Sequence, residues 1–316
     1  MNMKSILTPT RRQAVAVYVA VAALAAFVSL PVAWGQDQSQ LAEPVFRVAN
    51  EATSEPAAQP VAGAPVAAPQ PAAAPRSALD LTRQGDEHPL APFVRVCKGS
   101  LENVEQNIGD YSCTLVKQER VDGDLAEPQH ISMKVRREPF SVYMRFLKPF
   151  QGREVLYVDG QNNNEMFVLE AGWKRTMLGK MSFNPENAVV MRGQKYPVTR
   201  VGIRNLLGQL IKYNEAEMQY AECEVTSNPD IKITGRSTTM VQIVHPIPRQ
   251  NFRSHIARVF FDNELRVPIH YDAFMWPEQP GQQPPLEESY TYTNLKLNNG
   301  YTARDFDSEN PEIFRP

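Results

Sequence analysis

Apolar residues recur at helical spacing in two segments of the chain. From residue 90 to 108 they lie three or four positions apart, and from 203 to 211 they follow i, i+3, i+4, i+7 and i+8. They are Leu90, Phe93, Val94, Cys97, Leu101, Val104, Ile108, Ile203, Leu206, Leu207, Leu210 and Ile211. Such a period places apolar side chains on one helix face. We therefore predict two amphipathic helices that lie across a sheet.

Strand-like stretches, rich in β-branched and aromatic residues, fill most of the remaining chain. They cover residues 111–121, 129–137, 141–147, 153–160, 164–170, 221–226, 238–246, 255–263, 266–277 and 287–297. Many of the connections are short and rich in turn residues, and tightly joined neighbours run antiparallel because a parallel pair needs a long crossover. The predicted fold class is α+β. It is one large curled antiparallel sheet of about ten strands, an unclosed half-barrel covered on its concave face by two or three helices.

Flexible and aromatic apolar residues alternate along the strands between 141 and 170. Methionine adapts to poorly defined apolar shapes, and two or three helices leave part of a large concave face open. We predict a pocket there for an acyl chain or an apolar peptide; the alternative is that these side chains fill an ordinary core. The predicted lining is Val142, Met144, Phe146, Val155, Tyr157, Met166 and Val168. Residues 181–191 are predicted to form an irregular flap whose lid residues are Met181, Phe183, Val189, Val190 and Met191.

The chain before the folded part has two predicted sections. Residues 1–35 carry three basic residues, an apolar run from 14 to 30 and small residues at 33 and 35, which indicate a signal peptide cleaved before Gln36. The alternative is a retained membrane anchor, and the route, Sec or twin-arginine, stays open. Residues 36–88 are predicted to be a Pro/Ala-rich spacer, because 15 of the 20 residues from 56 to 75 are Pro or Ala. The folded domain spans 89–316, exported to the periplasm or cell envelope.

Charge and cysteine content restrict the function further. The formal charge of −2 becomes −5 when residues 1–35, with three basic and no acidic side chains, are removed. An acidic exported chain is a poor nucleic-acid binder. The three cysteines permit one disulfide at most. Cys97 is expected to be packed on its helix, and a bridge between Cys113 and Cys223 stays open.

The sequence has none of the motifs that mark nucleophile elbows, phosphate loops, dinucleotide folds or zinc proteases. His255 and His270 lie on facing strands of one predicted hairpin, yet no third ligand accompanies them. We predict no catalytic residue, no metal and no cofactor, and hence a protein that is not an enzyme; an unrecognised hydrolase is the minor alternative. Near the C-terminus, Phe306 is expected to dock while the acids around it stay solvated.

One stretch of the chain resembles a known superfamily. A strand ends near Pro139, the next carries Tyr143 and Arg145, and a third follows Gly152. This arrangement, within residues 134–168, resembles the central hairpins of the LolA/LolB-like lipoprotein carriers. The whole domain also resembles an uncharacterised family of exported bacterial proteins described only as a domain of unknown function. The carrier resemblance implies an unclosed barrel, a helical lid and a hydrophobic cavity for lipid-modified partners.

Two functional hypotheses follow. The first is a non-catalytic extracytoplasmic binder or carrier of a hydrophobic ligand, either an acyl chain or a lipidated protein. The second is an envelope interaction or sensor module that recognises a protein partner through exposed strand edges, without a small-molecule ligand. The sequence predicts no oligomeric state.

Overall fold

The computed structural model describes residues 79–220 and 222–314. The predicted signal peptide and most of the predicted spacer lie outside these residues and stay predictions. Leu79 and Leu81, which fall within the predicted spacer, are partly buried against the hydrophobic core.

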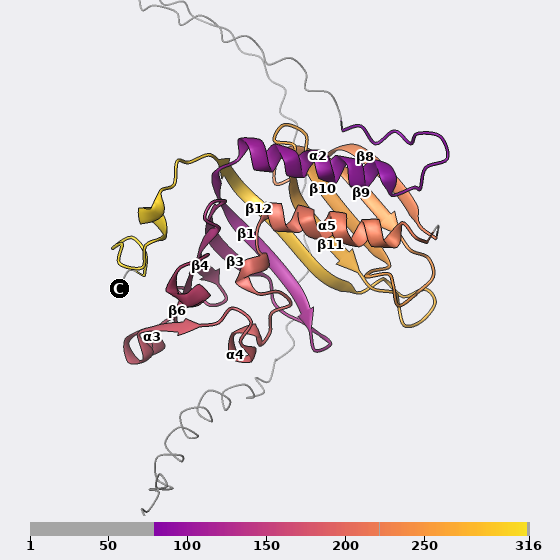
Figure 1. The fold of residues 1–316 in the computed structure, drawn as a ribbon. Helices are drawn as coiled ribbons and strands as arrows, with labels where there is room; N and C mark the ends of the chain where they lie inside the picture. The colour runs from indigo at the N-terminus through magenta and orange to yellow at the C-terminus, as the bar shows by residue number, and fades with distance from the viewer. Residues whose placement is uncertain (1–78, 221, 315–316) are drawn as a thin grey trace, which may run out of the picture. The chain divides into compact units, whose positions relative to one another are not determined.

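A single antiparallel sheet dominates the described part of the chain (Figure 1). Its strand order is β7-β6-β5-β4-β3-β1-β12-β11-β10-β9-β8, with the short β2 paired to β1. Because β7 and β8 end this path, the sheet is open. The strands are β1 (Asp110–Val121), β2 (Asp124–Leu125), β3 (Gln129–Arg136), β4 (Ser141–Lys148), β5 (Glu154–Val158), β6 (Met166–Leu169), β7 (Lys180–Phe183), β8 (Glu224–Ile233), β9 (Arg236–Val244), β10 (Ile256–Asp262), β11 (Pro268–Phe274) and β12 (Leu286–Leu297).

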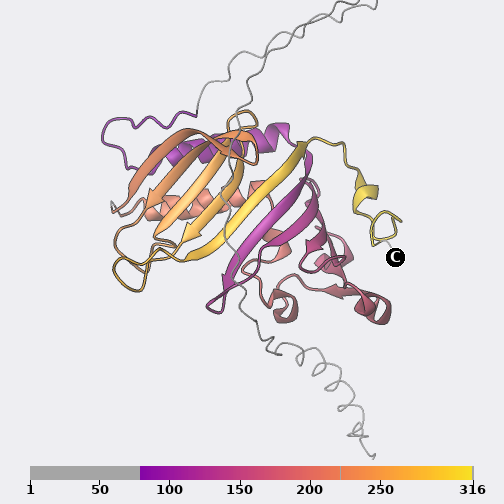
Figure 2. The ribbon, with the colours of Figure 1, turned by 180° about the vertical axis from the view of Figure 1, so that it is seen from behind.

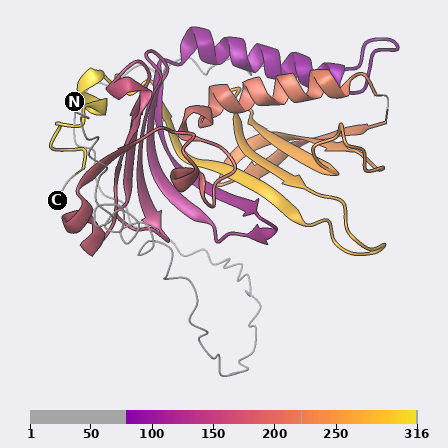
Figure 3. The same ribbon diagram turned by 60° about the horizontal axis from the view of Figure 1, so that its bottom comes forward.

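Two long helices lie side by side on the face toward which the sheet bends (Figures 1 and 3). They are α2 (Ala91–Asn107) and α5 (Ile203–Glu217). The shorter helices are α3 (Trp173–Leu178), α4 (Ala188–Met191), η1 (Asn162–Asn164), η2 (Val198–Arg200) and η3 (Ala303–Phe306). The predicted α+β class, with an unclosed antiparallel sheet under helices, is therefore confirmed.

The main hydrophobic core lies between the two long helices and the sheet. From α2, Phe93 is fully buried and packs edge-to-face on Phe261 of β10, with ring centroids 6.3 Å apart. From α5, Ile203 and Leu207 are buried in the same cluster. Burial of these apolar stripes is the main force that holds the helices on the sheet.

The opposite face of β4 and β5 carries a second, smaller core. The C-terminal segment, which lies beside the magenta strands in Figure 2, packs on this face. Phe306 and Ile313 are buried there in one cluster with Tyr143 and Leu156. The predicted docking of Phe306 is confirmed. Arg136 stacks over the Phe306 ring at 5.1 Å, so this cation is used to hold the C-terminal segment.

All ten predicted strands are present, and the structure adds β2 and β7. Cys97, Cys113 and Cys223 are free thiols, so the bridge left open between Cys113 and Cys223 does not form. Burial raises the pKa of Cys113 to about 12 and that of Cys223 to about 11. Both groups therefore stay protonated and unreactive near neutral pH.

Candidate functional site

A cavity of about 120 Å³ lies between α5, the segment 196–202 and the strands β1, β9, β10, β11 and β12. One part of its wall is apolar and comes from Leu115, Val201, Leu206, Leu210, Ile243 and Ala257. Another part carries five tyrosines, Tyr196, Tyr213, Tyr271, Tyr290 and Tyr292. The cavity thus combines an apolar interior with hydroxyl groups, as ligand sites generally do.

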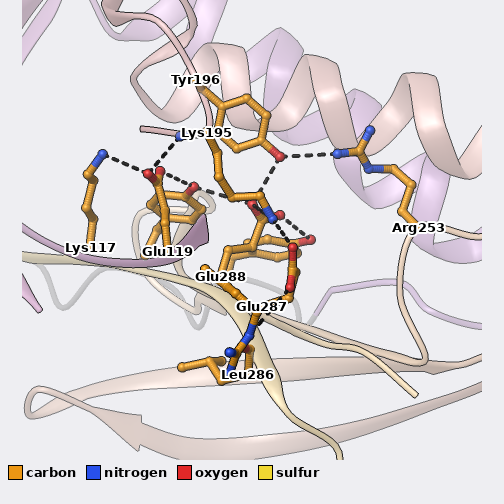
Figure 4. A network of polar contacts seen from close by, with 11 residues as sticks. Lys117, Glu119, Lys195, Tyr196, Arg253, Leu286, Glu287 and Glu288 are labelled. Atoms are coloured by element: carbon orange, nitrogen blue, oxygen red, sulfur yellow. Dashed lines mark hydrogen bonds and ion pairs between the residues drawn. The ribbon is translucent and has the colours of Figure 1, made fainter. Parts of the chain in front are cut away.

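Two buried carboxylates on neighbouring strands line this cavity; Figure 4 shows them within a network of polar contacts. Glu119 of β1 and Glu288 of β12 are directly opposite each other in the antiparallel register. Glu119 accepts hydrogen bonds from Tyr290 Oη at 2.6 Å and from Lys117 Nζ at 3.1 Å. Glu288 accepts one from Tyr196 Oη at 3.0 Å. These donors compensate the burial of two like charges side by side.

The same carboxylates fasten the segment that covers the cavity. The backbone N–H of Lys195 donates to Glu119 at 3.0 Å, and its ammonium lies 2.6 Å from Glu287 and 3.5 Å from Glu288. Burial, together with the nearby Glu288 and Glu119, raises the pKa of Tyr290 far above its ordinary value. This phenol therefore remains a hydrogen-bond donor, and the network ties the segment after α4 to the sheet (Figure 4).

A second polar group at the cavity wall has unpaired acceptors. The imidazole of His245 has its Nδ1 3.0 Å from the Ser254 carbonyl oxygen, and a carbonyl only accepts, so Nδ1 carries the proton. Nε2 is then an acceptor, and it has no hydrogen-bond partner among the described residues. The Oδ1 of Asn214, three residues before Glu217 on α5, is unpaired in the same way. The side chains of His245, Asn214 and Glu217 are each more than nine-tenths buried. Acceptor atoms without a hydrogen-bond donor are therefore costly at this place.

Glu217 completes this group. Its Oε2 lies 3.6 Å from His245 Nε2, and its Oε1 accepts the backbone N–H of Arg253 at 3.3 Å. Burial raises the pKa of Glu217 to about 7, although the Arg253 N–H and guanidinium act against this. Burial also lowers the pKa of His245. Below about pH 7 the pair therefore carries little charge, and the unpaired Nε2 of His245 is an acceptor for hydrogen-bond donors.

The residues predicted to line a ligand pocket lie together on one face of the sheet. Val142 pairs with Tyr157, Met144 with Val155, and Val155 with Val168 across neighbouring strands. All seven, Val142, Met144, Phe146, Val155, Tyr157, Met166 and Val168, are buried in the main core. None of them lines the cavity beneath α5. Their contact with a ligand stays a prediction, while the observed cavity lies toward β1 and β12.

The five predicted lid residues occupy two different elements. Met181 and Phe183 belong to the edge strand β7 and are paired with Val168 and Met166. This part of the segment was expected to be irregular and is instead a regular strand. Val189, Val190 and Met191 form α4; Val189 is 63% exposed, whereas Val190 packs against the core. Their role as a lid stays a prediction. The chain that covers the observed cavity begins at Tyr196, a few residues further on.

The two histidines of the predicted hairpin do not form a pair. His255 Nδ1 bonds the His245 carbonyl at 2.9 Å, and His270 Nδ1 lies 2.8 Å from Thr291 Oγ1. In residues 79–220 and 222–314 there is no group of three or more side chains arranged to hold a metal. Within the same ranges, no helix has the length and apolar character that crossing a membrane requires.

Several solved structures are similar to this chain at low sequence identity. A putative outer membrane lipoprotein-sorting protein domain from Vibrio parahaemolyticus is 10% identical, with 68% of this chain and 96% of that chain covered and a TM-score of 0.33. The lipoprotein LppX from Mycobacterium tuberculosis is 13% identical, with 69% and 100% covered and a TM-score of 0.39. A LolA superfamily protein from Nitrosomonas europaea is 6% identical, with 68% and 97% covered and a TM-score of 0.27.

A search of curated proteins finds no match to this chain. In contrast, the model of a family described as "Protein of unknown function (DUF1571)" matches residues 108–313, which contain the whole sheet. This match confirms the predicted membership of a family of unknown function. The chain belongs to the DUF1571 family.

Proposed function

We propose that this protein is an extracytoplasmic, non-catalytic binder of an amphiphilic ligand. Its apolar part, an acyl chain or the lipid group of a lipidated protein, occupies the cavity beneath α5. Its polar head donates hydrogen bonds to His245, Asn214 and Glu217. The observation that supports this proposal is the coexistence of an apolar wall and unpaired buried acceptors in one cavity.

The size of the cavity limits what it encloses. A cavity of roughly 150 Å³ holds a benzene molecule, so 120 Å³ suits an apolar group of about five or six carbons. Each buried methylene contributes about 0.8 kcal/mol, which gives about 5 kcal/mol and a dissociation constant of roughly 0.1–1 mM from the tail alone. Hydrogen bonds from the head group add to this affinity. A longer chain requires α5 to move away from the sheet.

The start of α5 offers a place where such a movement can begin. Gly202, the residue before the helix, has φ +106°, and a Cβ there would lie 2.8 Å from Tyr111 Oη. The backbone N–H of Ile203 donates to this same oxygen at 3.0 Å. Glycine alone fits here without strain, and the junction between the covering segment and α5 is held by this hydrogen bond together with the burial of Ile203 in the main core.

Binding of a short amphiphile tests the proposal. Calorimetric titration of the protein with hexylamine, whose ammonium has three donors, is expected to give submillimolar affinity. The variant Leu210→Trp is expected to bind at least tenfold more weakly, because the indole fills the cavity from α5. Ile247→Trp is the matched control, since Ile247 is 54% exposed and lies outside the cavity lining.

Three outcomes of this experiment have distinct meanings. Tighter binding of hexylamine than of hexanoic acid supports a donor head group at the acceptor cluster. Equal binding of both, still lost in Leu210→Trp, supports the apolar site and contradicts the assignment of the head group. No binding of either, together with native mass spectrometry that finds only empty protein from its own envelope, overturns the proposed function.

Recognition of a protein partner through a strand edge is less well supported. The edge strand β8 contains Pro229, and its pairing with β9 shifts register between Asn228 and Ile231. A proline and an irregular register are features that protect an edge from the addition of another strand.

A further inference from the structure

Two basic, acid-free segments lie next to each other at one end of the sheet. Residues 145–153 and 172–180 each contain three basic and no acidic residues. The first contains the end of β4 and the turn that leads to β5, and the second contains α3. They are joined because Arg175 Nη1 donates to the Gly152 carbonyl at 3.2 Å and also pairs with Glu154 at 3.2 Å. We call the exposed surface of these two segments the α3 surface.

The α3 surface carries most of the large apolar side chains that face solvent. Of the eight exposed large hydrophobic residues in the described chain, five belong to it. They are Leu147 at 43%, Phe150 at 40%, Trp173 at 68%, Met177 at 68% and Leu178 at 37% exposure. Such grouping of apolar side chains on a surface marks an interaction site rather than scattered exposure.

The basic residues around these side chains fall into two groups. Arg153 and Arg175 are partly buried and paired with Glu170 and Glu154, and the exposed Lys180 is paired with Glu309. Arg145, Lys148 and Lys174 are exposed, and none of the ion pairs of the described residues includes them. The surface therefore presents uncompensated positive charge next to tryptophan, phenylalanine, leucine and methionine.

We propose that the α3 surface docks the domain on an anionic membrane. Trp173, Met177 and Phe150 enter the interface between head groups and acyl chains, and Lys148 and Lys174 contact lipid phosphates. Aromatic and aliphatic side chains beside lysine and arginine are the composition of interfacial anchors. The absence of acidic residues from both segments is complementary to an anionic surface rather than to a basic protein partner.

The geometry of α3 suits this role. The helix has six residues, and its flanking residues Gly172 and Gly179 have φ values of 59° and 62°. None of its residues is fully buried. It lies at the far end of the sheet from α2 and α5 (Figure 1), so docking does not cover the cavity beneath α5. The inference is thus independent of the proposed ligand.

Vesicle binding tests the inference directly. The protein from Gln36 onward, without the predicted signal peptide, is mixed with vesicles of phosphatidylcholine alone or with 30% phosphatidylglycerol. Binding is expected to be at least tenfold tighter to the anionic vesicles and to weaken with added salt. In a Trp276→Phe background of this protein from Gln36 onward, which lacks Trp34, Trp173 is the remaining tryptophan, and its emission is expected to shift to shorter wavelength on binding.

Matched variants separate the apolar and the electrostatic contributions. Trp173→Ala with Met177→Ala, and separately Lys148→Glu with Lys174→Glu, are each expected to weaken binding to anionic vesicles at least tenfold. Ile247→Ala and Lys232→Glu make the same kinds of change at other exposed positions and are expected to leave binding within twofold. All the changed side chains are exposed, so every variant is expected to fold, and circular dichroism checks this.

Several results would overturn the inference. These are no binding to anionic vesicles, equal binding to both vesicle types, or equal loss in the control variants. Capture of a defined protein partner through the α3 surface, with no vesicle binding, would replace the membrane with that partner. Failure here leaves the hexylamine test unaffected, since none of the changed residues lines the cavity.

Discussion

Replacement of Phe93 by alanine is expected to lower the free energy of unfolding by about 3–5 kcal/mol. The Phe93 side chain is fully buried, and its ring packs on Phe261, which is also fully buried. Truncation removes this contact and leaves a cavity between α2 and β10 that the surrounding side chains fill only in part. Since domains of this kind are stable by about 5–15 kcal/mol, this single change removes a large share of the total.

Urea unfolding followed by circular dichroism measures the effect of Phe93→Ala. The urea concentration at the midpoint of unfolding is expected to fall. The slope of the free energy of unfolding against urea concentration is expected to stay unchanged, because the surface exposed on unfolding is nearly the same. Trp173→Ala removes an even larger aromatic side chain that is 68% exposed, and it is expected to change stability by at most about 0.5 kcal/mol. A loss below 1 kcal/mol for Phe93→Ala would mean that α2 does not pack on β10 as described.

The elements of this fold were predictable wherever their period extends over many residues. Phe93 and Cys97 on α2 follow a helical period over about five turns, Leu207 on α5 follows one over about two turns, and the long strands alternate. The strand β7 was missed because it is four residues long and lies between Gly179 and Pro185. Its only sign is the spacing of two between Met181 and Phe183, too short a pattern to distinguish from an irregular segment.

The location of the cavity was not predictable in the same way. The face of Val142 and Met144 was identified correctly as inward, but whether such a face is filled or hollow depends on where the helices lie. The acidic pair arises because the register of β1 and β12 brings together Glu119 and Glu288, which are far apart in the sequence. The sequence does contain one sign of this polar site. Along β1 the residues that face the cavity change from the apolar Leu115 to the charged Lys117 and Glu119.

The polar group beneath α5 makes stability depend on pH in a direction that can be derived. Glu217 is faced by His245, by the backbone N–H and guanidinium of Arg253, and by Cys223, whose thiol stays protonated. Its folded pKa of about 7 lies above the ordinary value of 4.5. The folded state therefore binds more protons than the unfolded state between these values, so stability falls as pH rises through this window. The expected loss between pH 5 and pH 8 is on the order of 3 kcal/mol.

Glu217→Gln is expected to abolish this loss, because the glutamine amide is neutral at every pH and its N–H can donate to His245 Nε2. The variant should match the wild-type stability near pH 5 and exceed it by on the order of 3 kcal/mol at pH 8, measured by urea unfolding at each pH. The depressed pKa of His245 acts in the opposite sense, at acidic pH, in both proteins, and so cancels in the difference. Glu215→Gln, on the same helix with its side chain 45% exposed and paired to Lys98, is expected to change stability alike at pH 5 and pH 8. If the free energy of unfolding depends on pH in the same way in wild type and in Glu217→Gln, Glu217 is as well solvated as a surface carboxylate. The cluster of His245, Asn214 and Glu217 beneath α5 would then contain no buried acid.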